Sequence, residues 1–144
     1  MADQSTLVEA VIRVLHDSSK GFPDIGEHLK DNVAKSFFME EGHTRATFAR
    51  ELEAELPADK RDIGGTGIGA IHRNWGDLKA KLGGGDHTLL ETAEQGEDAA
   101  KKAYQEALEA SDLSATTRQT LLRQQQHIVA SHNKVKAMRD TVTV

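Results

Sequence analysis

The sequence predicts an all-α protein built as a four-helix bundle. Only 4% of its 144 residues are aromatic and only two are proline, a composition suited to a helical core of alanine, leucine and valine. Apolar residues recur at three- and four-residue spacing in four long segments. Glycine, proline and capping residues separate these segments. The length suits one domain, residues 1–144, with a real core.

The first helix is expected over about residues 4–29. Val11 and Leu15 belong to its apolar face, which repeats with helical spacing. Pro23 interrupts this pattern, because proline lacks a backbone donor and clashes with the preceding turn. We expect one kinked helix rather than two separate ones.

The second helix is expected over about residues 32–56. Asp31 is a capping residue at its start, and Pro57 ends it. Its inward row is predicted to comprise Phe37, Glu40 or Glu41, Thr44, Phe48 and Leu52.

A long crossover follows, and it contains a short helix over about residues 67–82. Trp75, Leu78 and Leu82 lie on one side of this helix, which is expected to pack across the bundle. The glycines before it lack the flanking strand and the lysine of a phosphate-binding loop. They predict a connection rather than a nucleotide site.

Two more long helices are expected, over about residues 86–110 and 114–140. Gly83–Gly85 ends the crossover helix and Asp86 caps the next one. Short turns make the helices of each pair antiparallel neighbours, and the crossover joins the two hairpins. This is the connectivity of ferritin-like bundles.

One carboxylate, Glu97, lies in the apolar row of the helix over 86–110. Leu90, Ala93, Ala100 and Tyr104 share that row. A buried acid is unfavourable unless another group pairs with it. Glu97 therefore predicts either a polar layer that fixes the helix register, with His132 or Gln125 as partner, or a metal site.

Charge and composition narrow the function classes. The net charge of −5 and the scattered Lys and Arg residues argue against nucleic-acid binding. The absence of cysteine excludes disulfides and thiolate metal sites. Residues 1–6 do not resemble a signal peptide, and no apolar run approaches the ~20 residues of a membrane span. A cytoplasmic, bacterial-type protein with no membrane partner is expected.

Several segments follow a recognisable pattern, namely Phe22, residues 48–52, residues 69–75 and residues 94–104. Its most specific parts are His-Arg-x-Trp at 72–75 and Glu-x-Gly-Glu-Asp-Ala at 94–99. On these residues the chain resembles a bacterial domain-of-unknown-function family of ferritin-like four-helix-bundle proteins, over essentially its whole length. The resemblance implies the fold and, by context, an association with stress responses. It implies no agreed activity.

A di-iron bundle site needs a Glu from each of two helices and a Glu-x-x-His pair from each of the other two. The sequence supplies part of this set, and the candidate metal ligands are Glu40, His43, Glu94, Glu97 and His132. Val129 stands where an acid should precede His132, and Ser18 where the first helix should supply one. The pattern argues against di-iron oxidase chemistry and permits a degenerate site for iron, manganese or zinc.

Three functions remain open from the sequence. The first is a non-enzymatic interaction module, stress-associated by context, that forms a homo-oligomer, most simply a dimer, or binds an unidentified protein partner. The second is a metal-binding protein that uses the five candidate ligands. The third is a small-molecule carrier with a cavity beside the alanine-rich helix over 86–110.

Overall fold

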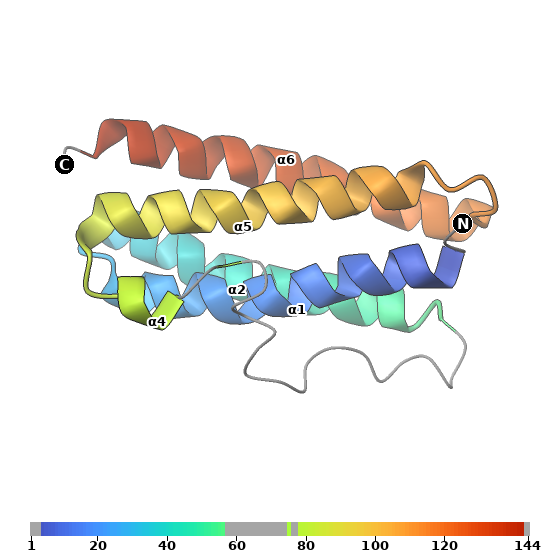
Figure 1. Ribbon diagram of the computed structural model, residues 1–144, viewed down its shortest axis with the longest axis horizontal. Coiled ribbons are helices and arrows are strands. Elements are labelled where there is room, and N and C mark those ends of the chain that lie inside the picture. Colours follow the sequence, from blue (N-terminus) through green and yellow to red (C-terminus); the bar gives the residue numbers. More distant parts are fainter. Residues whose placement is uncertain (1–3, 57–74, 76–77, 143–144) are drawn as a thin grey trace.

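The computed structural model describes residues 4–56, 75 and 78–142, and four long helices dominate this part of the chain. They are α1 (Gln4–His28), α2 (Asn32–Glu53), α5 (Gly85–Leu108) and α6 (Ala115–Thr141), and a short helix, α4 (Leu78–Lys81), precedes α5. The long helices lie side by side as two antiparallel hairpins (Figure 1). The predicted all-α four-helix bundle is therefore confirmed, with helix ends within three residues of those expected.

The helices form a ring in the order α1, α2, α6, α5. Close packing joins α1 to α2 and to α5, and α5 to α6, whereas side chains bridge α2 and α6. The core divides into two apolar clusters. One includes Val11, Leu15, Leu52 and Leu121, and the other includes Phe22, Phe38, Leu89 and Val135.

Pro23 lies inside α1, so the prediction of a continuous first helix is confirmed. The ring of Pro23 lies against Gly42 of α2, where an added Cβ would collide with it. A residue without a side chain thus lets the two helices approach closely at the proline.

A polar side chain caps the start of α2, whereas α5 begins without a side-chain cap. The Asp31 side chain caps α2 by accepting a hydrogen bond from the backbone N–H of Ala34 at 2.8 Å, as predicted. Asp86 is not the cap of α5, since it lies in the first turn after Gly85, whose φ is 87°. Its carboxylate instead accepts the backbone N–H groups of Lys30 and Asp31, at 2.9 and 3.2 Å. Asp86 therefore ties α5 to the turn between α1 and α2.

Trp75 of the crossover is fully buried between α1 and α5. Its indole lies edge-on to Phe22, with 5.2 Å between ring centroids. A Cβ added to Gly21 or to Gly96 would lie 2.7 Å from Trp75 Cδ2, so both glycines make room for the ring. The predicted packing is confirmed for Trp75 and Leu78, and the rest of the expected helix before residue 78 lies outside the described residues.

Within the described part of the chain, no helix combines the length and the hydrophobicity needed to cross a bilayer.

Candidate functional site

Four polar side chains form a buried layer between the two apolar clusters. Glu41 and Arg45 come from α2, Glu97 from α5 and Ser131 from α6. Their residues are only 0 to 4% exposed to solvent. We call these four residues the buried layer.

Arg45 lies at the centre of the buried layer. Its Nη1 is 2.7 Å from Oε1 of Glu97, and its Nε donates to Oε2 of Glu41 at 3.2 Å. Ser131 accepts from Arg45 Nη2 at 3.0 Å and donates to Glu97 Oε2 at 2.7 Å. The guanidinium also lies over the ring of Phe22, 4.6 Å from its centroid. One cation thus connects two carboxylates from different helices.

His127 of α6 links the buried layer to the surface. Its Nε2 donates to Oε1 of Glu41 across 2.7 Å, and its side chain is 40% exposed. The ring packs edge-on against Phe48, with centroids 5.3 Å apart.

Electrostatics hold the buried layer in its charged form. Burial raises the pKa of Glu41, but the hydrogen bond from His127 and the charge of Arg45 outweigh it and leave the pKa below its ordinary value. Burial lowers the pKa of Arg45, but the charge and contact of Glu97 outweigh it and raise the pKa. Glu41 and Arg45 therefore stay ionised near neutral pH.

A second group of buried polar side chains surrounds Gln124, which lies two turns before Ser131 on α6. Tyr104 donates to Gln124 Oε1 at 2.7 Å, and the Gln124 amide donates to the backbone oxygen of Phe48 at 3.2 Å and to Glu51 at 3.0 Å. Burial raises the pKa of Tyr104 far above its ordinary value. The hydrogen-bond acceptor of Tyr104 is thus an amide oxygen. A phenol held neutral in this way positions helices and is a poor acid or base.

A family model described as a domain of unknown function, DUF2383, matches residues 3–110. The chain belongs to this family. No curated protein matches it. The DUF2383 match covers α1, α2 and α5, whereas α6, which supplies Ser131, Gln124 and His127, follows the matched residues.

In this DUF2383 protein the five predicted metal ligands do not form one site. Glu40 and His43 are exposed on α2. Glu94 pairs with Arg139 of α6, and the ring of His132 donates from Nε2 to Asp98 at 2.8 Å. Glu97 is buried as predicted, but its partners are Arg45 and Ser131 rather than His132 or Gln125.

The described residues contain no group of three or more His, Asp or Glu side chains arranged to hold a metal ion. At the centre of the bundle the guanidinium of Arg45 already balances Glu97. The candidate residues therefore do not fit a metal as a set, and metal binding stays a prediction for experiment.

The sequence reasoning missed Arg45, Ser131 and His127. Arg45 carries a usable signal, because it follows Glu41 by four residues and so lies on the same helix face. Ser131 lies in the buried row of Ile128 and Val135, but the spacing does not distinguish it from the adjacent His132, and His127 lies outside that row.

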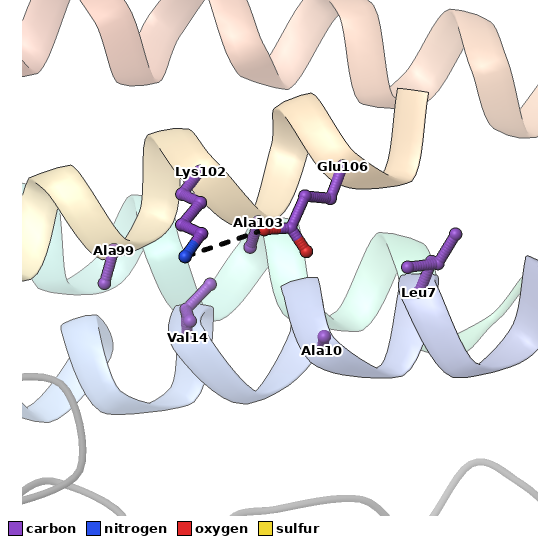
Figure 2. Close-up of a pocket in the computed structure, with 7 residues that line it drawn as sticks. All are labelled: Leu7, Ala10, Val14, Ala99, Lys102, Ala103 and Glu106. Atoms are coloured by element: carbon purple, nitrogen blue, oxygen red, sulfur yellow. Dashed lines mark ion pairs between the residues drawn. The ribbon is translucent and has the colours of Figure 1, made fainter. Parts of the chain in front are cut away.

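A groove of about 310 Å³ lies on the outer surface between α1 and α5. Small apolar residues line it, namely Leu7, Ala10, Val14, Ala99 and Ala103, and Lys102 and Glu106 complete the lining (Figure 2). Lys102 Nζ is 3.9 Å from Glu106 Oε1, and the two side chains are 78% and 51% exposed. We call this feature the α1–α5 groove.

Proposed function

We propose that the protein is a non-enzymatic, ferritin-like helical-bundle module that acts by self-association, with the α1–α5 groove as its dimer interface. The buried layer supports the non-enzymatic part of the proposal. Its carboxylates are engaged by Arg45, Ser131 and His127, so it functions as a lock on helix register. Cytoplasmic location and a link to stress responses stay predictions.

The α1–α5 groove favours a second copy of this chain because its charged residues complement themselves. In a two-fold symmetric contact, each residue i that meets residue j is matched by j meeting i. A two-fold axis between Lys102 and Glu106 sets Lys102 of each copy against Glu106 of the other. The Lys102 stem then covers Ala99 and Ala103, and its ammonium finds an acid.

The outer face of α6 is a poorer interface for a second copy. Leu122 and Val129 are 43% and 38% exposed and lie two helical turns apart. Five of the six fully charged residues of α6 are basic. The six are Arg118, Arg123, Lys134, Lys136, Arg139 and Asp140. Two copies of this mainly basic helix repel each other when they pair side by side.

Charge exchange across the α1–α5 groove tests the proposal. Lys102→Glu gives each copy two acids at the interface, and Glu106→Lys gives two bases. Each variant alone is expected to be monomeric by light scattering, with dimer affinity reduced by about tenfold or more. An equal mixture of the two variants is expected to form a heterodimer, because the acids of one then face the bases of the other.

Both substitutions change exposed side chains, so unchanged helical circular dichroism serves as the folding control. Leu122→Glu on α6 is the matched control and should leave the dimer intact. A monomeric native protein, or a mixture that does not associate, contradicts the proposal. Dissociation by Leu122→Glu alone would move the interface to α6.

A further inference from the structure

The buried layer carries an imbalance of charge. It contains two carboxylates, Glu41 and Glu97, but only one cation, Arg45, and all three side chains are at most 5% exposed. An excess negative charge among buried side chains is unfavourable. One further positive charge beside the layer makes it electrically neutral.

His127 is placed to provide that charge. Its Nε2 contacts Glu41 at 2.7 Å, and its side chain is 40% exposed, so solvent can reach the ring. Histidine is the side chain that can take up or release a proton around neutral pH, so this residue can add a positive charge beside the layer or withdraw it.

The other groups around His127 do not remove the imbalance. On α6, Arg123 precedes it by one turn, but Arg123 is 56% exposed and its Nη2 pairs with Glu51 at 2.8 Å. On the same helix Ser131 is neutral. From α1, the neutral ring of Phe22 lies against Arg45, and the buried charged residue of that helix, Asp17, is an acid and adds no positive charge. The charged or titratable groups facing His127 and its layer from α2, α5 and α6 are Glu41, Arg45, Glu51, Glu97, Tyr104 and Arg123.

We infer that His127 and Glu41 form a proton-dependent latch between α6 and α2. With His127 protonated, the buried layer is neutral and α6 is held firmly on α2. With His127 neutral, the hydrogen bond from Nε2 to Glu41 persists, but the layer keeps one unbalanced negative charge. Side-chain hydrogen bonds join α2 to α6, so a rise in pH weakens the contact between these two helices. This pH response is independent of dimerisation.

Two substitutions separate charge from hydrogen bonding. His127→Gln keeps a donor toward Glu41 but cannot be charged, and His127→Arg is always charged. Between pH of about 5.5 and 8.5, the unfolding constant of the native protein is expected to rise about threefold to tenfold more than that of either variant. His127→Arg should retain the higher stability throughout, and His127→Gln the lower.

Hydrogen exchange reports the location of the change. For amide protons of α6 around residues 124–131, the exchange rate is compared with the intrinsic rate at the same pH. In the native protein this ratio should rise at high pH, and in His127→Arg it should not. His132→Gln is the matched control, since His132 pairs with the exposed Asp98 and not with the buried layer. Equal pH profiles in the native protein and both His127 variants, or loss of the response in His132→Gln instead, would overturn the latch. If His127→Gln does not fold, His127→Arg and the exchange data decide.

Discussion

Arg45 Nη1 and Glu97 Oε1 lie 2.7 Å apart at the centre of the bundle, and neither side chain is exposed to solvent. Removing Arg45 leaves Glu97 and Glu41 in the core without the cation that they share, and an uncompensated buried charge destabilises folded proteins by about 3–5 kcal/mol. We therefore expect Arg45→Met to lower the free energy of unfolding by about that amount in urea titrations. Glu94→Ala, which breaks a partly exposed pair with Arg139, should lower it by about 1 kcal/mol or less.

Replacing both charges at once provides a further check on this pair. Arg45→Met combined with Glu97→Leu removes the cation and one acid together and leaves Glu41 with His127. We expect this double variant to be more stable than Arg45→Met alone, because Glu97 is then no longer a buried acid without a cation. Equal or greater destabilisation would show that the pair contributes through packing rather than charge.

The glycines beside Trp75 should not tolerate a side chain. Gly96→Ala puts a Cβ against the indole, and overpacking of this kind typically destabilises by about 1–3 kcal/mol. Gly83→Ala is the control, since nothing lies within 4 Å of its added Cβ. Adding Trp75→Leu to Gly96→Ala should reduce the additional loss, and thermal unfolding of the four proteins measures the coupling.

Glu41 should make the fold sensitive to acid. The pKa of Glu41 is lower when folded than its ordinary value of 4.5, so its stabilising contribution is complete above that pH. The contribution is lost as pH falls through the folded pKa. Glu41→Gln should show a smaller loss of stability than the native protein between neutral pH and acid. A steeper acid loss in the variant would contradict this assignment.

Tyr104 should remain protonated in alkaline solution for as long as the protein is folded. Burial raises its pKa, and it is the single tyrosine of the chain, so phenolate absorbance reports it alone. We expect no phenolate signal until unfolding begins. Tyr104→Phe should destabilise by about 1–2 kcal/mol, because Gln124 Oε1 loses its donor.

Metal analysis tests the remaining sequence hypothesis. The native protein, purified without an affinity tag, is incubated with ferrous iron, manganese or zinc and analysed by mass spectrometry. Three of the five predicted ligands, Glu94, Glu97 and His132, are held in separate pairs, and the other two are exposed on α2, so we expect no stoichiometric metal to be retained. Retention that is lost in both Glu97→Ala and His132→Ala would restore the metal-binding hypothesis.

The sequence predicted α1 and α5 better than α2 and α6, and burial explains why. On α5 the row of Leu90, Ala93, Ala100 and Tyr104 is apolar and buried, so Glu97 stands out in the correct register. On α2 the inward positions are polar at the centre, and hydrophobic spacing alone did not distinguish Glu41 from its exposed neighbour Glu40.

On α6 the same ambiguity misplaced the inward face by one residue. Gln124 and Ser131 are buried, whereas the prediction favoured Gln125 and His132. The partners of these polar residues come from other helices and follow from the fold, not from local spacing. Hydrophobic periodicity therefore predicted the four helices, but it could not predict the hydrogen bonds between polar side chains of different helices.

The wedge formed by Trp75 between α1 and α5 has a practical consequence. Trp75 is the only tryptophan in the chain and is fully buried, so the intrinsic fluorescence of the protein arises from one known position. Its emission reports whether the Trp75 ring lies against Gly21 and Gly96. The protein thus contains a built-in optical reporter, which can show whether the crossover separates from the bundle before the four long helices melt.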